Sequence, residues 1–235
     1  MNKKVLFIIP AFNEEANILK AVQSIHQENA EWDILVINDG STDQTGQICK
    51  DHQIPVINLV MNLGIGGAVQ TGYIYAHRHH YDIAIQFDGD GQHEISSVYD
   101  LIQPILDDKA DFVIGSRFID KKRDNFQSSS LRRIGIRIIS AFIWVLSGKP
   151  VLDPTSGFRA ANKKVIEFFA TYYPTEFPEP ESNLMLNRKK FRTQEIYARM
   201  HERQGGTSSI RTWISAYYMI NVCFSLVVTS LRKLD

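Results

Sequence analysis

Short apolar runs that alternate with helical patterns constrain the fold of this chain more than any other feature of its sequence. The runs cover residues 5–9, 34–37, 55–59, 83–87 and 112–117, and the helical patterns cover residues 14–28, 66–77 and 96–106. Strands that alternate with helices in this way are joined by crossovers and form a mostly parallel sheet with helices on its faces. The sequence therefore predicts a doubly wound α/β fold.

Composition limits the number of domains and the classes of partner. The chain has 235 residues, of which 44% are hydrophobic, and it carries 26 basic and 26 acidic residues. This balance is enough for one sizeable core, and it argues against general nucleic-acid binding, which needs a basic surplus. Cys49 and Cys223 form no zinc spacing, and residues 5–10 are too short for a signal-peptide core. We expect a reducing setting, a catalytic domain over residues 1–210 and an appended helix over residues 211–235.

The fourth apolar run ends abruptly in two carboxylates, Asp88 and Asp90. Ligands of open α/β sheets bind where the strands end, so these side chains are expected to point into a cleft. Oxygen ligands at this spacing suit Mg²⁺ or Mn²⁺ holding a diphosphate. The alternative is a turn whose aspartates only cap the next helix.

Acidic residues also follow the first two apolar runs, at Glu14 and Asp39. Carboxyl ends of parallel strands meet at one edge of a sheet, where a nucleotide base, a ribose and a metal-bound diphosphate could bind side by side. Glu14 has a simpler alternative role, because acidic residues favour the positive end of a following helix.

Other nucleotide and metal motifs do not fit the sequence. Residues 64–67 (GIGG) lack the third glycine of a dinucleotide fingerprint, since Val69 stands at that place. Residues 88–99 fail as a calcium loop, because His93 and Tyr99 replace the required glycine and glutamate. A dinucleotide-dependent oxidoreductase and a calcium sensor are both excluded.

Two segments have the composition of membrane-contacting helices. Residues 131–146 start with arginines and continue with apolar residues that include Trp144, and residues 212–231 contain no charged side chain. In the second segment Ile220, Phe224, Val227 and Leu231 gather opposite Ser225 and Thr229 at 100° per residue. We expect helices that lie on a membrane or against a partner; a buried core helix for the first segment and a spanning helix for the second are the alternatives.

Six motifs in order resemble those of the family 2 glycosyltransferases, and most of all the dolichyl- or polyprenyl-phosphate sugar synthases. They are residues 10–14 (PAFNE), 38–45 (NDGSTDQT), 61–68 (MNLGIGGA), 88–93 (DGDGQH), 115–117 (GSR) and 153–159 (DPTSGFR). The resemblance runs from about residue 4 to about residue 210. It implies a glycosyltransferase-A fold, a nucleotide-sugar donor and a divalent metal, Mg²⁺ or Mn²⁺.

The resemblance also implies roles for individual residues. The metal ligands would be Asp88, Asp90 and Gln92, and the nucleotide sugar would contact Pro10, Phe12, Glu14, Asp39, Gly67, Asp88, Gly89, Asp90, Arg203 and Ser208. Arg117 and the turn at residues 153–159 would line the acceptor side, with Arg132, Arg133 and Arg137 as further cations available to the acceptor phosphate, and the catalytic set would be Asp88, Asp90, Arg117, Asp153 and Arg203. Asp153 has the alternative role of capping the turn at Pro154, and the alternative for Arg203 is a surface turn. One departure is Asn38, where many relatives carry aspartate, and it leaves the nucleotide preference open.

We therefore expect inverting transfer of a hexose or N-acetylhexosamine to polyprenyl phosphate at the cytoplasmic membrane face, with a UDP-sugar preferred as donor. A phosphate oxyanion is already nucleophilic near neutral pH, so it needs positioning cations rather than a base. One alternative acceptor is a saccharide hydroxyl, which needs a basic side chain such as Asp153. Another alternative is a non-catalytic subunit that docks on a small integral-membrane partner. The apolar helix face at residues 212–231 would also suit a second copy of the chain.

Overall fold

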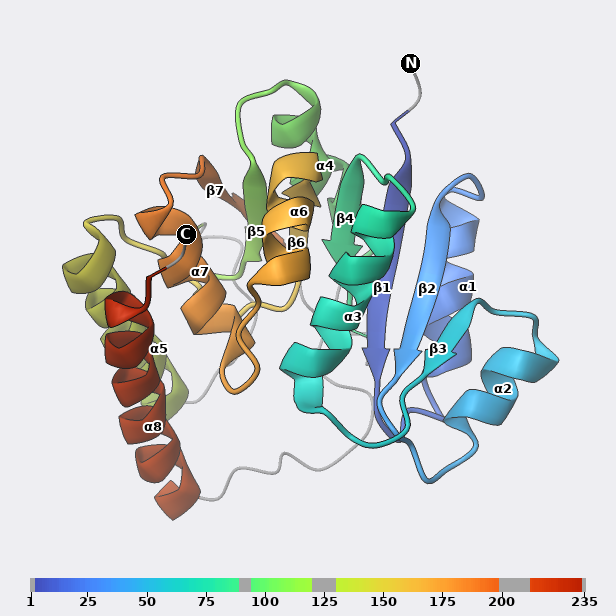
Figure 1. Ribbon diagram of the computed structural model, residues 1–235, viewed down its shortest axis with the longest axis horizontal. Coiled ribbons are helices and arrows are strands. Elements are labelled where there is room, and N and C mark those ends of the chain that lie inside the picture. Colours follow the sequence, from blue (N-terminus) through green and yellow to red (C-terminus); the bar gives the residue numbers. More distant parts are fainter. Residues whose placement is uncertain (1–2, 89–93, 120–129, 199–211, 234–235) are drawn as a thin grey trace.

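The computed structural model describes residues 3–88, 94–119, 130–198 and 212–233, which form one α/β sandwich (Figure 1). Seven strands lie within these residues: β1 (Val5–Ala11), β2 (Asp33–Asn38), β3 (Val56–Asn58), β4 (Ile83–Gln86), β5 (Phe112–Ser116), β6 (Arg159–Asn162) and β7 (Thr193–Tyr197). The helices described are α1 (Ile18–Glu28), α2 (Thr45–Asp51), α3 (Gly64–Arg78), α4 (Ser97–Leu106), α5 (Ser130–Ser147), α6 (Lys163–Thr171), α7 (Pro178–Arg188) and α8 (Thr212–Leu231).

The strands form a mixed sheet in the order β3-β2-β1-β4-β6-β5-β7. The pairs β1–β2, β2–β3, β1–β4 and β5–β7 are parallel, whereas β6 runs antiparallel to both β4 and β5. The predicted α/β class and mostly parallel sheet are confirmed. The reversed strand β6 and its neighbours α6, α7 and β7 were not predicted.

Helices cover both faces of the sheet, with α3 and α6 on one face and α1 and α4 on the other (Figure 1). Side chains of a strand alternate between the two faces, so β1 places Phe7 in the core under α1 and Ile8 in the core under α3. This explains why β1 is a continuous apolar run, as expected for a strand buried on both sides. Helix α1 meets its core with an apolar stripe at Ile18, Ala21, Val22 and Ile25.

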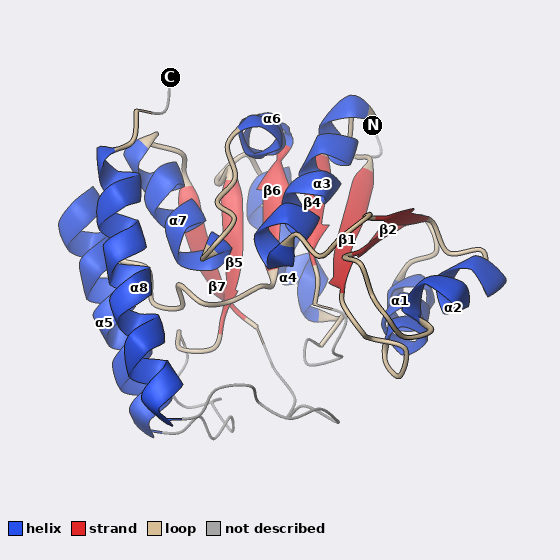
Figure 2. Ribbon diagram, turned by 60° about the horizontal axis from the view of Figure 1, so that its bottom comes forward, coloured by secondary structure: helices blue, strands red, loops and turns tan. Residues whose placement is uncertain are grey.

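Helices α5 and α8 lie side by side at one flank, next to α7 (Figures 1 and 2). They pack closely, since a side-chain carbon on Gly135 would lie 3.1 Å from the Met219 sulfur. Their first turns are at the same end of the molecule as the carboxyl ends of β1 and β4 (Figure 1). Across the part of the chain that the structure describes, none of the helices is long and apolar enough to cross a membrane.

The orientation of α8 is unusual for a surface helix. Thr229 on its polar side is buried and donates a hydrogen bond to Glu181 Oε2 on α7 at 2.5 Å. Ile220, Phe224 and Leu231, which belong to the predicted apolar face, are exposed. The face of α8 that packs on the protein therefore combines the apolar side chains of Val222 and Leu226 with the polar Thr229, while other apolar side chains of the helix are exposed.

Candidate active site

The strand ends that carry acidic residues meet at one edge of the sheet. Strands β1 and β2 are in register so that Ala11 pairs with Asn38, and β4 runs parallel to β1 on its other side. The loops after these strands bring Glu14, Asp39 and Asp88 to the carboxyl edge, as predicted from the sequence.

Hydrogen bonds tie the loop after β1 to the loop after β2. Asn13 has a positive φ of 56°, and its backbone N–H donates to Ser41 Oγ at 3.0 Å. The Glu14 N–H donates to Thr45 Oγ1 at 2.9 Å, and the Thr42 N–H donates to Asn13 Oδ1 at the same distance. The two loops therefore form one rigid wall, with the half-exposed ring of Phe12 at its rim.

Asp39 and Asn38 have different roles at the end of β2. Asp39 is 3% exposed, and its Oδ1 accepts the Leu63 N–H at 2.7 Å, which fixes the start of α3 and its Gly67. Asn38 donates from Nδ2 to Asn58 Oδ1 at 2.7 Å. Asn38, which stands where many relatives carry aspartate, is thus hydrogen-bonded to β3. Asp39 is the carboxylate at the end of β2.

Asp88 follows β4 and rests on the backbone of Gly157. A side-chain carbon at Gly157 would lie 2.8 Å from Asp88 Oδ1 and 2.9 Å from its Cγ, and closer still to Oδ2. A side chain at position 157 would therefore displace the Asp88 carboxylate. Gly157 lies in the motif at residues 153–159, but the sequence did not indicate its contact with Asp88, because that contact depends on how two distant loops pack.

The Asp88 side chain has the chemistry of a ligand for a divalent cation. Its carboxylate is partly exposed at the carboxyl edge, and hard cations such as Mg²⁺ and Mn²⁺ prefer oxygen ligands. The other expected ligands, Asp90 and Gln92, lie outside the described residues, as does Gly89. Within the described residues, no three His, Cys, Asp or Glu side chains gather into a metal-binding group.

Arg117 and Asp153 form a buried ion pair. Arg117 donates from Nε to Asp153 Oδ2 at 2.7 Å and from a terminal nitrogen to Oδ1 at 2.6 Å, and both side chains are shielded from solvent. Thr155 accepts a further hydrogen bond from Arg117 at 2.8 Å. The sequence predicted both residues as catalytic, and the structure brings them together as partners of each other.

A second carboxylate, that of Glu195, holds the backbone at Asp153 in place. The backbone N–H groups of Leu152 and Asp153 each donate to Glu195 of β7 at 2.8 Å. Burial raises the pKa of the Glu195 carboxyl, and the nearby Asp153 raises it further, against the lowering effect of these hydrogen bonds. Glu195 lies on a strand with little apolar pattern, so sequence analysis missed it.

The remaining predicted residues are only partly placed. Arg133 and Arg137 are exposed on the first turns of α5, and Pro10 is half-buried on β1. The side chain of Arg132 and the whole of Arg203 and Ser208 lie outside the described residues. Glu14 Oε2 accepts a hydrogen bond from Asn17 Nδ2 at 2.9 Å, beside the start of α1.

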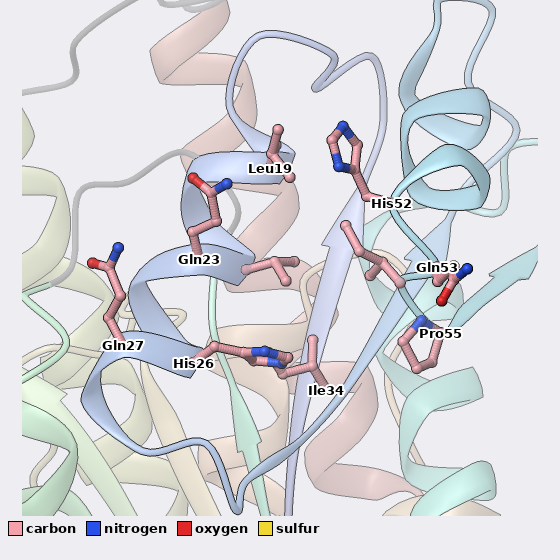
Figure 3. A pocket seen from close by; sticks show the side chains of 10 residues that line it. Leu19, Gln23, His26, Gln27, Ile34, His52, Gln53 and Pro55 are labelled. Carbon is pink, nitrogen blue, oxygen red and sulfur yellow. The ribbon is translucent and has the colours of Figure 1, made fainter.

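The pocket in Figure 3 is a different feature. It has a volume of about 490 Å³ and lies between α1 and the turn before β3, with Leu19, His26, Ile34 and His52 in its wall. Because Ile34 is near the start of β2, this pocket is at the amino end of the strands, opposite the carboxyl edge. It is therefore separate from the acidic residues at the strand ends.

Comparison with known proteins identifies the family of the chain. Residues 6–169 match the family model described as glycosyl transferase family 2. The chain belongs to this family. The resemblance found in the motifs is therefore confirmed, and this family 2 member is a glycosyltransferase.

Characterised relatives act on lipid phosphates, as their names state. The UDP-N-acetylglucosamine–dolichyl-phosphate N-acetylglucosaminyltransferase of Methanococcus voltae is 31% identical over 207 residues, which cover 80% of this glycosyltransferase and 81% of that protein. The undecaprenyl-phosphate mannosyltransferase of Micrococcus luteus is 29% identical over 163 residues, covering 67% of this chain and 65% of that protein.

The fold is shared with a solved glycosyltransferase structure. Glucosyl-3-phosphoglycerate synthase from Mycobacterium tuberculosis, crystallised with Mn²⁺ and UDP-glucose, superimposes with a TM-score of 0.68 at 19% identity. The match covers 97% of this glycosyltransferase and 79% of that chain. The similarity therefore supports the predicted glycosyltransferase-A fold over nearly the whole chain.

Proposed function

We propose that this glycosyltransferase moves a hexose or N-acetylhexosamine from a nucleotide diphosphate sugar to polyprenyl phosphate, with inversion at the anomeric carbon. The observation that carries the proposal is the outward apolar face of α5 and α8, whose first turns lie at the same end as the carboxyl edge. A lipid-borne phosphate at a membrane surface could reach the site from this side. The named acceptors of its relatives are phosphates of this kind.

The donor is proposed to bind along the carboxyl edge. The exposed ring of Phe12 offers a surface for a base, and Asp39 and Glu14 lie beside it. Asp88, with Asp90 and Gln92, would hold Mg²⁺ or Mn²⁺, which when bound supplies positive charge to the departing diphosphate. A UDP-sugar is our preferred donor, in keeping with the Methanococcus voltae relative.

The surroundings of Asp153 favour a phosphate acceptor over a hydroxyl acceptor. A general base must reach the proton of the attacking hydroxyl and have a free lone pair for it. Asp153 instead is fully buried and accepts two short hydrogen bonds from Arg117. A phosphate oxyanion needs no such base, only cations such as Arg133 and Arg137 to hold it in line.

The transfer reaction is tested directly with a radiolabelled donor. Incubation of the protein with UDP-N-acetylglucosamine or UDP-glucose, undecaprenyl phosphate and Mn²⁺ is expected to give an organic-soluble product that mild acid cleaves. The same incubation with lipid-linked saccharide in place of the lipid phosphate is the control. Label on the saccharide and none on the lipid phosphate would favour the hydroxyl acceptor, and no product from UDP-, GDP- or TDP-sugars would favour a non-catalytic role.

The proposal also places the protein at the cytoplasmic face of the cell membrane. Helix α5 exposes Ile134, Ile138 and Phe142, spaced four residues apart, so they form one stripe. Helix α8 exposes Ile220 and Phe224 with the same spacing beside it. Arginines at the start of α5 suit anionic headgroups next to this apolar surface.

Replacing Phe224 with glutamate is expected to lower partitioning onto anionic vesicles about tenfold. Burying an aromatic ring in the interface stabilises the bound state by about 1.5–3 kcal/mol, and the new charge opposes insertion. Co-sedimentation with phosphatidylglycerol vesicles measures the effect. The matched control is Leu106→Glu on α4, away from the two helices, where an exposed leucine gains the same charge. Equal losses for both variants would contradict a specific membrane face.

A further inference from the structure

Glu179 is a carboxylic acid at the carboxyl edge that the sequence did not predict as a site residue. It lies in the first turn of α7, and α7 begins at the same end of the molecule as the carboxyl ends of β1 and β4 (Figure 1). Its Oε1 lies 3.5 Å from Nε2 of Gln86, the last residue of β4 and two positions before Asp88. Glu179 is therefore close to the point where the chain leaves β4 for Asp88.

The segment before α7 packs directly on the start of α3. A side-chain carbon at Gly66 would lie 2.5 Å from the Cα of Thr175, so the two backbones are in close contact. Asp39 accepts the N–H of Leu63 just before α3, which fixes the same helix start to the end of β2. The first turn of α7 is thus tied to the part of the edge where the donor nucleotide is proposed to bind.

Arg159 ties α7 to the turn on which Asp88 rests. Its buried guanidinium donates to Ser182 Oγ at 2.7 Å and to the backbone carbonyl of Ser156 in that turn. Ser182 follows Glu179 by three residues, so both lie on the same side of α7. These bonds hold the first turn of α7 and the support of Asp88 together.

Hydrogen bonds orient the carboxyl group of Glu179. The Tyr173 hydroxyl donates to Gln86 Oε1 at 3.4 Å, which turns the amide nitrogen of Gln86 toward Glu179 Oε1. The second oxygen, Oε2, makes no hydrogen bond to another of the residues that the structure describes, and Glu179 is partly exposed. One oxygen is therefore held by the protein, and the other can accept a hydrogen bond from a ligand.

The carboxyl group of Glu179 suits a hydroxyl ligand in either protonation state. Burial raises its pKa, the Arg159 guanidinium lowers it, and the Asp88 carboxylate raises it. An ionised carboxylate accepts hydrogen bonds at both oxygens, and the neutral acid can both accept and donate. A sugar hydroxyl also both donates and accepts, so it can pair with either form.

The transferred sugar must lie between the departing diphosphate and the acceptor. In an inverting transfer, the acceptor oxygen attacks the anomeric carbon from the side opposite to the leaving group. The diphosphate is proposed to bind at Asp88, and the acceptor phosphate at the arginines of α5. Helix α7 packs against α5 and α8 and is linked through Arg159 to the turn under Asp88. Its first turn therefore lies between the two proposed binding sites.

We propose that Glu179 binds a hydroxyl group of the donor sugar and contributes to the choice of sugar. The inference rests on the proposed function and adds a sugar-binding residue to it. The alternative is that Glu179 only stabilises the positive end of α7, as acids in a first helical turn do. That role would affect stability, but it would not distinguish a nucleotide sugar from the nucleotide alone.

Binding of UDP and of UDP-sugars with Mn²⁺, in the absence of an acceptor, separates these roles. We expect Glu179→Ala to leave the affinity for UDP nearly unchanged and to weaken binding of UDP-glucose or UDP-N-acetylglucosamine about tenfold, because one hydrogen bond to the sugar is lost. Glu179→Asp withdraws the acid by one methylene group and is expected to weaken the same binding, so it replaces the alanine variant if that variant does not fold. Isothermal titration calorimetry gives the affinities, and thermal unfolding shows that each variant is folded.

Deoxy sugars identify the hydroxyl that Glu179 binds. Removing that hydroxyl from UDP-glucose should weaken binding to the wild type about tenfold and have little effect on Glu179→Ala, whose partner group is already missing. Removal of the other hydroxyls should affect both proteins equally. The matched control is Glu176→Ala, since Glu176 is exposed three residues earlier in the chain and should behave like the wild type.

The outcomes for this inference and for the proposed function are distinguishable. Wild-type protein that binds no UDP-, GDP- or TDP-sugar would contradict the proposed function itself. Wild-type protein that binds a nucleotide sugar, together with a folded Glu179→Ala variant of equal affinity for it, would overturn only the sugar contact. Equal weakening of UDP and UDP-sugar binding would also overturn it, because the defect would then lie outside the sugar.

Discussion

Asp88→Asn is expected to lower the rate of sugar transfer by about 1000-fold while the protein stays folded. The substitution keeps the shape of the side chain but removes the negative charge expected to bind the cation. A metal ion contributes several kcal/mol to stabilising a leaving diphosphate, and each 1.36 kcal/mol changes the rate tenfold. Initial rates at saturating donor and Mn²⁺, with circular dichroism of each variant, measure the effect.

Gly157→Ala tests the same carboxylate by displacement rather than by loss of charge. The new methyl group would collide with the Asp88 carboxylate and force it to move. A shift of about 1 Å in a reacting group can cost about 100-fold in rate, so we expect a loss of that order. The control is Gly64→Ala: a side-chain carbon at Gly64 meets nothing within 4 Å, although its positive φ adds backbone strain. Full activity of Asp88→Asn would contradict the proposed metal site.

The sequence predicted the strands that are apolar runs, β1 to β5. Strand β1 is buried on both faces, and its pattern is therefore unmistakable, as is that of β4. Because these strands are parallel, the same patterns also predicted that Glu14, Asp39 and Asp88 would share an edge. This part of the site follows from topology, without knowledge of any side-chain contact.

Strands β6 and β7 and helices α6 and α7 were missed for physical reasons, although β5 between the two strands was predicted. Strand β6 has only Ala160 and Ala161 as apolar residues and begins with a buried arginine. Helix α7 carries no apolar periodicity, because it buries polar residues such as Glu181, Ser182 and Asn187, which form hydrogen bonds with residues on neighbouring elements. Burial of paired polar groups leaves no hydrophobic pattern, so such elements are visible only in three dimensions.

The pairing of Arg117 with Asp153 was beyond sequence analysis for a related reason. The two residues are 36 positions apart, and each belongs to a motif with its own expected role. Their side chains meet because β5 and the turn before β6 converge behind the carboxyl edge. The predicted roles of both residues in acceptor binding and catalysis stay predictions, and their partnership changes how variants must be interpreted.

Asp153→Ala is expected to destabilise the protein by about 3–5 kcal/mol, because it leaves Arg117 buried without its counter-charge. For a chain of this size, such a loss lowers the melting temperature by roughly 6–20 °C. Differential scanning calorimetry or denaturant unfolding measures it. The control is Asp107→Ala, which removes an exposed ion pair with Lys109 at 2.8 Å and should leave the melting temperature nearly unchanged.

The double variant Arg117→Met with Asp153→Leu distinguishes the charge effect from simple loss of packing. Replacing both charges with apolar side chains of similar volume removes the unpaired ion, so the double variant should be more stable than Asp153→Ala. If instead the losses from the two positions add, the pair is not coupled as the geometry indicates.

Variants of Asp153 also distinguish a phosphate acceptor from a hydroxyl acceptor, provided that rates are compared per folded molecule. Asp153→Asn keeps an oxygen that can accept from Arg117 and should fold at reduced temperature. If Asp153 only holds Arg117 in place, the rate per folded molecule falls modestly and the pH profile keeps its shape. If Asp153 is the base for a hydroxyl acceptor, the rate falls by about 100-fold or more and the acidic limb of the profile, which reports deprotonation of the base, disappears. The second result would replace the phosphate acceptor by a saccharide hydroxyl.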